Sequence, residues 1–353
     1  MRKLIIGCIV IAILALAVFF IATREQTPRD EKTIRIGVIL PLSGNMELYG
    51  KQIKEGIEFY KKQHPPTPEK PYEIIYEDDQ MMPAKTASAA KKLIHVDKVD
   101  WLGTGLSMQS FVVGPMVENT NTRHISYSSD TNFTKYKNNY DITVNIQDDV
   151  RVMLDEIQRR GYKRIAMLSA NEVFADLVEI TVKDLIKEYE MELVFNSKIM
   201  LGVRNFRIDI AKAEMMKPDI YILQTWSPEL EIVMRQLREK TNTPITTIVS
   251  FFLSLMPELF EGQFGTASYV QDEKFLNDFY EMFQKYPAQL QAFSYTMMSM
   301  IMNAEKGDLD LDEYVKKNGM SVFGPLRAVD SKIAHYPSVI KEIRNGKPVV
   351  IQE

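Results

Sequence analysis

Short apolar runs alternate with amphipathic segments along most of the chain. The run at 34–40 is almost entirely apolar, which predicts a strand buried in a parallel sheet. Pro, Ser and Gly residues at 41–44 end this run. Apolar residues then recur at Ile53, Ile57 and Tyr60, which is the spacing of a helix. The opening segment is therefore predicted to be strand, loop and helix, with the loop at the strand's carboxyl end, where open α/β sheets bind ligands.

The same alternation continues toward the C-terminus. Further strands are predicted at 72–76, 99–103, 124–127, 164–168, 192–199, 218–225 and 245–249. Helices are predicted at 84–95, 111–118, 149–160, 175–189, 228–238, 274–285 and 289–304. Asn345 and Gly346 predict a hairpin turn before a last extended run at 348–351. Alternating strands and helices favour parallel sheets, and a second unit of the same plan begins near residue 146, so two α/β lobes are expected.

The first 32 residues are predicted to form a targeting segment. Arg2 and Lys3 precede an uncharged apolar run at 4–22, and a polar tether follows it. The apolar core of a signal peptide has about 7–15 residues and a membrane-spanning helix needs about 20, so this length favours an uncleaved anchor over a cleaved signal peptide. Under either interpretation the remainder of the chain lies outside the cytoplasm.

Composition and charge remove several classes of function. A chain of 353 residues exceeds the usual size of a single core. Its formal net charge is −4 and no basic stripe appears, so nucleic-acid binding is not expected. The one Cys is Cys8, inside the N-terminal apolar run, which leaves the rest of the chain without an intrachain disulfide.

Motifs that carry catalysis are missing. The four His residues show no metal-binding spacing, and neither a Gly-x-Ser-x-Gly elbow nor a phosphate-binding glycine loop is present. The methionines near 297–302 stand at helical positions, where they are expected to fill a core. The sequence therefore predicts a non-enzymatic protein with no metal and no cofactor.

Several short sequence motifs occur one after another along the chain. They are Gly37, Pro41-Leu-Ser-Gly44, Tyr49-Gly50, Glu77-Asp78-Asp79, Pro83-Ala84, Gly103, Pro115, Pro218-Asp219 and Met234-Arg-Gln-Leu-Arg238. In this order and spacing the chain resembles the leucine/isoleucine/valine-binding family of extracytoplasmic solute receptors over about 33–350.

The resemblance implies a two-lobed type I periplasmic binding protein fold with the ligand cleft between the lobes. The first lobe would contain 33–146 and 273–320, and the second 147–272 and 321–353. The implied function is capture of a small solute by hinge closure and delivery to the permease of an ABC importer. A branched-chain or aromatic amino acid is the expected solute. An amide, urea or an aromatic acid remains an alternative, as does sensing on behalf of a separate signalling partner.

The resemblance also implies a set of solute-binding positions. These are Tyr49, Ser107, Ser128, Asp130, Phe174, Trp226 and Ser250. Ser107 matches a loop Ser that holds the solute's carboxylate, while Tyr49, Phe174 and Trp226 match aromatic positions of the cleft. Aromatic faces of this kind suit a flat apolar or a cationic group.

One implied position departs from the family pattern. Ser250 stands where amino-acid binders often carry a Glu, and a buried ammonium needs a negative partner. One hypothesis is that this acid has moved across the cleft to Asp130. The rival interpretation is that Asp130 only caps the turn formed with the two residues after it, because Asp is common at such positions.

Overall fold

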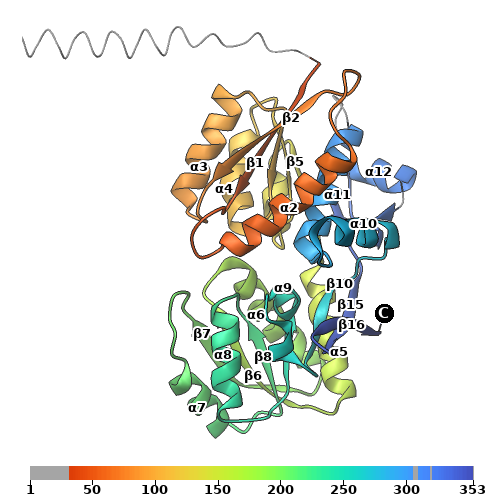
Figure 1. The fold of residues 1–353 in the computed structure, drawn as a ribbon. Coiled ribbons are helices and arrows are strands. Elements are labelled where there is room, and N and C mark those ends of the chain that lie inside the picture. Colours follow the sequence, from red (N-terminus) through yellow and green to blue (C-terminus); the bar gives the residue numbers. More distant parts are fainter. Residues whose placement is uncertain (1–31, 305–308, 319, 353) are drawn as a thin grey trace, which may run out of the picture.

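The computed structural model describes residues 32–304, 309–318 and 320–352, and Figure 1 shows that they form two lobes, one above the other. The targeting segment predicted at 1–32 lies outside the described residues except for its last position. Within the described ranges, no helix combines the length and the apolar character needed to cross a membrane.

The first lobe is built on a seven-stranded sheet. Its strands, from one edge to the other, are β2 (Tyr72–Asp78), β1 (Ile34–Leu40), β3 (Trp101–Thr104), β4 (Arg123–Ser126), β5 (Asn139–Thr143), β14 (Ile333–His335) and β13 (Arg327–Ala328). Every neighbouring pair is parallel except β14 with β13. From β1 the chain passes to β2 on one side, and β3 is followed by β4 on the other side, so the strand order reverses between β1 and β3. The loops after these two strands therefore lie at the same edge of the sheet and leave a crevice between them.

The second lobe repeats this plan. Its sheet contains β7 (Glu192–Ile199), β6 (Arg164–Ala170), β8 (Ile220–Gln224), β9 (Ile245–Ile248), β10 (Phe264–Ser268), β15 (Ser338–Arg344) and β16 (Lys347–Gln352). The pairs from β7 to β10 are parallel, whereas β15 and β16 are antiparallel to their neighbours. The predicted hairpin turn at 345–346 is confirmed between the last two strands.

Helices cover both faces of each sheet (Figure 1). Those of the first lobe are α2 (Glu47–Gln63), α3 (Pro83–Lys91), α4 (Ser107–Val117), α10 (Glu273–Phe283), α11 (Gln289–Ala304) and α12 (Leu311–Asn318). Those of the second lobe are α5 (Ile146–Arg159), α6 (Val173–Leu185), α7 (Arg207–Met215), α8 (Glu229–Arg238) and the short α9 (Ser250–Leu253). In the first lobe, α2 packs against α11 while α3 packs against α4; in the second, α5 packs against α6 and α7 against α8. The predicted two-lobed α/β fold is thus confirmed.

Three segments connect the lobes, after β5, after β10 and between β14 and β15. This arrangement corrects one part of the expected division, which assigned all of 321–353 to the second lobe. Residues 327–335 instead form β13 and β14 and extend the first sheet, where β14 pairs with the edge of β5. An unpaired strand edge offers free backbone groups, and a late segment of the chain has satisfied those of β5.

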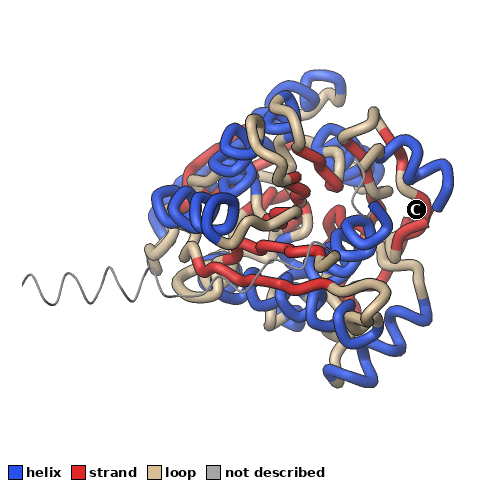
Figure 2. The backbone as a smooth tube through the Cα atoms, turned by 90° about the horizontal axis from the view of Figure 1, so that it is seen from above, coloured by secondary structure: helices blue, strands red, loops and turns tan. Residues whose placement is uncertain are grey.

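Close packing fixes α11 beside α2 within the first lobe. A Cβ atom added to Gly56 of α2 would lie 2.1 Å from the carbonyl oxygen of Gln291 and 2.2 Å from the hydroxyl oxygen of Ser294. Only a glycine therefore permits this approach of the two helices. The contact matters for the site because α11 begins at Gln289, which lines the pocket described below. Figure 2 shows the backbone of the molecule from above, with its helices in blue and its strands in red.

Candidate functional site: a pocket between the lobes

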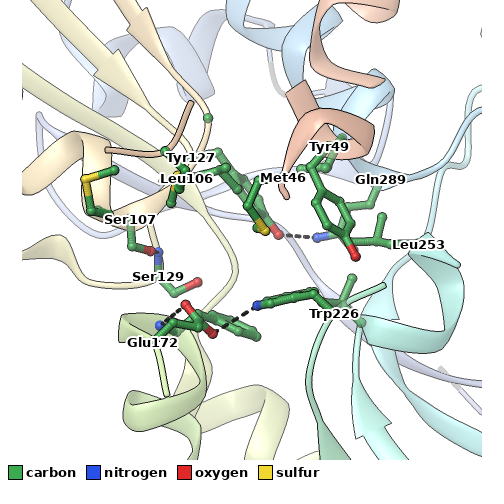
Figure 3. Close-up of a pocket in the computed structure, with 16 residues that line it drawn as sticks. Met46, Tyr49, Leu106, Ser107, Tyr127, Ser129, Glu172, Trp226, Leu253 and Gln289 are labelled. Atoms are coloured by element: carbon green, nitrogen blue, oxygen red, sulfur yellow. Dashed lines mark hydrogen bonds between the residues drawn. The ribbon is translucent and has the colours of Figure 1, made fainter. Parts of the chain in front are cut away.

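A pocket lies between the two lobes, and residues from both of them line it (Figure 3). The first lobe contributes Met46, Tyr49, Met81, Gly105, Leu106, Ser107, Met108, Tyr127, Ser129, Gln289 and Leu290. The second lobe contributes Glu172, Phe174, Trp226, Val249 and Leu253. The space between their atoms amounts to about 600 Å³, part of which is open to solvent. Its loops follow the carboxyl ends of parallel strands in both sheets, the location that the opening segment of the sequence predicted.

Tyr49 connects the two lobes at one side of this pocket. Its ring lies edge-on to that of Trp226, with 5.6 Å between the ring centres. The backbone N–H of Ser227 donates a hydrogen bond of 2.9 Å to the Tyr49 hydroxyl. Burial raises the pKa of this hydroxyl above its ordinary value, so it is neutral and keeps a proton to donate. Tyr49 therefore holds the lobes together and forms part of the wall.

Trp226 and Phe174 form the aromatic floor in the second lobe. Their ring centres are 5.5 Å apart at an interplanar angle of 36°. Trp226 follows β8 and Phe174 lies in the first turn of α6, after β6, so adjacent strands of one parallel sheet bring them together. The indole N–H of Trp226 donates to Oε1 of Glu172 at 3.1 Å, which fixes the orientation of its ring.

Glu172 is the carboxylate of the pocket wall. It precedes α6 and accepts hydrogen bonds from the backbone N–H groups of Phe174 at 2.9 Å and Ala175 at 2.8 Å. These bonds and the helix dipole favour the charged form. Burial outweighs them and raises the pKa of Glu172 above its ordinary range. The carboxylate is thus held in a fixed position in an apolar setting.

Ser107 opens α4 on the opposite wall. Its hydroxyl oxygen accepts a hydrogen bond of 3.2 Å from the backbone N–H of Ser129, which ties the two loops together. The first turn of α4 contains no acidic residue, and no side chain caps it. A helix start of this kind attracts anions through its free N–H groups and its dipole. The expected role of Ser107 beside a solute carboxylate is compatible with this position.

Tyr127 and Gln289 meet at the back of the pocket. The side-chain amide of Gln289 donates to the hydroxyl of Tyr127. The other polar atom of that amide, Oε1, is buried and has no hydrogen-bond partner within the protein. A buried acceptor of this kind is costly unless a donor reaches it. Gln289 thus brings a buried acceptor without a partner to the pocket lining.

Three of the predicted residues do not reach the pocket wall. Asp130 caps its own turn, because its Oδ1 accepts from the backbone N–H of Asn132 at 2.9 Å and from that residue's side-chain amide at 2.6 Å. Ser128 is fully buried and donates its hydroxyl to the carbonyl oxygen of Asp130 at 2.9 Å. Ser250 accepts from the side-chain amide of Gln224 at 3.0 Å inside the second lobe. The turn-capping interpretation of Asp130 thus describes its contacts in this structure.

Several pocket residues were missed by the sequence reasoning. A signal for Glu172 was present, since it is an acidic residue just before a helix, in the same loop as the predicted Phe174. Tyr127 was predicted as the last residue of the strand at 124–127, whereas β4 ends at Ser126 and Tyr127 begins the loop. Gln289 had no local signal, because α11 reaches the pocket only through its packing on α2.

The chemistry of this arrangement is binding. Its walls are mostly apolar and aromatic, with a carboxylate on one side, a helix start on the other and an unpartnered amide oxygen. Within the described ranges no group of three or more His, Cys, Asp or Glu side chains is placed to hold a metal ion. A pocket of this composition fits a small solute with an apolar body and a few polar groups.

Comparisons with known proteins agree with this fold. The model of the family described as "Periplasmic binding protein" matches residues 33–318. Leu/Ile/Val-binding protein homolog 6 of Brucella abortus (strain 2308) is 29% identical over 133 residues, which are 37% of this chain and 33% of the relative. The chain thus matches about a third of the length of these curated relatives.

Solved structures match over almost the whole chain at low identity. A solute binding protein of an ABC transporter from Rhodopseudomonas palustris BisB5, in complex with 3,4-dihydroxy benzoic acid, has a TM-score of 0.80 at 20% identity, covering 92% of this chain and 97% of that one. The branched-chain amino acid transporter substrate binding protein LivJ of Streptococcus pneumoniae, in complex with isoleucine, has a TM-score of 0.78 at 17% identity, covering 91% and 100%. Likeness at such identities shows a shared fold. The family match over 33–318, together with the two lobes and the pocket between them, shows that the chain belongs to the periplasmic binding protein family, with the type I fold of the Leu/Ile/Val-binding proteins.

Proposed function

We propose that this protein captures a small solute between its lobes outside the cytoplasm and delivers it to the permease of an ABC importer. The observation that carries this proposal is the pocket at the closed interface, where Tyr49 of one lobe touches Trp226 and Ser227 of the other. A solute that contacts both walls stabilises the closed form, and the closed form is the surface that a permease would recognise. The solute is bound without chemical change.

An amino acid with a branched-chain or aromatic side chain is the proposed solute. The apolar and aromatic wall suits such a side chain, and the start of α4 with Ser107 suits its carboxylate. The Brucella relatives and the isoleucine complex bear names that agree with this class.

An aromatic acid is the second candidate solute. The tilted pair formed by Trp226 and Phe174 presents faces on which a flat ring packs well. Solute-binding proteins of this fold from Rhodopseudomonas palustris are recorded with benzoate and with 4-hydroxybenzoate. Both candidates keep the same receptor function and differ in the charge that the solute brings to Glu172.

A thermal-shift screen of the purified full-length chain tests the proposal. The panel contains the branched-chain and aromatic amino acids, simple amides, urea, benzoate and hydroxybenzoates. A solute at about 100 times its dissociation constant stabilises the folded state by roughly 2.7 kcal/mol, which is a readily measured shift. A shift with one solute class supports the receptor function. The absence of a shift with every member of the panel at millimolar concentration would contradict capture of these solutes.

A further inference from the structure

Glu172 is a carboxylate without a cationic partner on the pocket wall. No Lys, Arg or His among the described residues forms an ion pair with it, and the charged group nearest in effect is another acid, Asp176. Its three hydrogen bonds come from neutral donors, two of them backbone N–H groups and the third the indole of Trp226. A carboxylate offers about four acceptor positions, so one is left for a donor from the pocket.

The opposite wall has the complementary character. The start of α4 carries Ser107 and lacks any acidic residue, so its free N–H groups favour a negative group. Figure 3 shows Ser107 and Ser129 of the first lobe on one side of the cleft and Glu172 of the second lobe on the other. The pocket is therefore polarised from one lobe to the other.

A second acceptor without a partner belongs to a residue that lines the pocket from a different element. Gln289 is 7% exposed, and its Oε1 has no partner within the protein. Its amide N–H is directed to the hydroxyl of Tyr127, another residue of the pocket lining. Two acceptors in one small apolar pocket indicate a solute that brings several hydrogen-bond donors on a compact group.

We propose that Glu172 is the residue that binds the ammonium group of an amine-bearing solute. The inference rests on the proposed function and narrows its solute to an α-amino acid. The carboxylate of this amino acid would lie at the start of α4 in the first lobe, and its ammonium group would face Glu172 in the second lobe. Glu172, in the loop before α6, would thus take the role of the Glu that the family resemblance leads one to expect at position 250. Asp130 would remain a turn cap.

The charge of the bound group should distinguish an α-amino acid from an aromatic acid in this pocket. A benzoate brings a second negative charge into an apolar pocket that already contains a carboxylate, and like charges at short range in low dielectric repel strongly. An ammonium instead compensates the buried charge and forms a charge-assisted hydrogen bond with it. If Glu172 has this role, the protein should prefer a solute with an amine over the same solute without it.

Isothermal titration of the full-length chain with matched solute pairs tests this inference. The pairs are L-leucine with 4-methylpentanoate and L-phenylalanine with 3-phenylpropanoate, which differ only in the amine. Benzoate is titrated as well. The variants are Glu172→Gln, which keeps an acceptor for Trp226 but removes the charge, and Asp130→Asn as the matched control. Because the readout is the ratio of two affinities in one variant, a loss of folded protein does not affect it.

The wild-type chain is expected to bind the amine-bearing member of at least one pair ten times more tightly or better. Glu172→Gln is expected to lose most of this preference, while Asp130→Asn keeps it. A preference that survives in Glu172→Gln, or that vanishes in Asp130→Asn, overturns the inference. Binding of benzoate but of no amino acid overturns the inference and leaves the receptor function intact. Binding of no probe at all overturns both.

Discussion

The backbone N–H of Ser227 in the second lobe donates a hydrogen bond to the hydroxyl of Tyr49 in the first, at 2.9 Å. Tyr49 is almost completely buried, although it belongs to the helix that faces the cleft. Because the donor and the acceptor belong to different lobes, this bond exists only while the lobes are closed. It therefore couples one wall of the pocket to closure.

Replacement of this hydroxyl is expected to weaken binding. Tyr49→Phe keeps the ring that lies against Trp226 and removes the acceptor for Ser227, at a net cost of about 1 kcal/mol to the closed form. The affinity for the solute should fall about fivefold, as measured by calorimetry. Tyr189→Phe is the matched control, since the hydroxyl of Tyr189 bonds to Asp155 within the second lobe. An equal effect of the two variants would contradict a role in closure.

Tryptophan fluorescence is expected to report binding through one residue. The chain contains two Trp residues, of which Trp101 is fully buried in the first lobe and Trp226 lines the pocket. A solute that packs on Trp226 changes the surroundings of its indole ring. The emission change on titration should therefore disappear in Trp226→Phe and persist in Trp101→Phe. The reverse pattern would mean that the solute does not contact this wall.

Gly56→Ala is expected to disturb the site from a distance. The added methyl group would overlap the backbone of Gln291 and push α11 away from α2. Overpacking of this kind costs roughly 1–3 kcal/mol, which denaturant unfolding would show as a lower midpoint. Solute affinity should fall as well, because α11 carries Gln289 into the pocket. Lys61→Ala, an exposed change in the same helix, should leave both quantities unchanged.

Asp149 is expected to make stability fall as the pH rises. Burial raises the pKa of its carboxyl from 3.8 to about 7. Between these two values the folded state binds more protons than the unfolded state, so the free energy of unfolding decreases with rising pH and is lowest above about pH 7. Asp149→Asn should remove this decrease, a gain of up to about 4 kcal/mol at pH 8 that is absent at pH 4.

Unfolding in urea across this pH range measures the effect. The control is Asp312→Asn, because Asp312 is paired with Lys316 at 2.5 Å on the surface of another helix. Groups other than Asp149 titrate alike in the wild type and the variant, so their contributions cancel in the difference. Parallel pH profiles for the wild-type chain and Asp149→Asn would contradict the predicted cost of burying this carboxyl.

The predicted fold succeeded where local pattern and burial agree. The strands β1, β6 and β8 are short apolar runs, and each is almost wholly buried in a parallel sheet. The strands β5 and β10 were not predicted, although they are just as buried. Alternate side chains of β5 are polar: Oδ1 of Asn139 hydrogen-bonds with the ring of His124, and Oδ1 of Asp141 accepts from the backbone N–H of Ser128. Partners far along the chain make that burial possible, so its own pattern does not reveal it.

The residues of the candidate site were likewise predicted only in part. Tyr49, Ser107, Phe174 and Trp226 line the pocket as the sequence suggested, because each follows the carboxyl end of a parallel strand whose position the pattern gives.

What the sequence determined by itself is the alternation of strands and helices, the two lobes and the loops that carry the pocket. These follow from hydrophobic periodicity and turn residues, which act over a few neighbours. Only the tertiary structure decided which loop residues face the cleft, that Glu172 rather than Asp130 presents its carboxylate there, and that Gln289 joins them. Each of these depends on packing and hydrogen bonds between segments far apart in the chain, and no local pattern encodes such contacts.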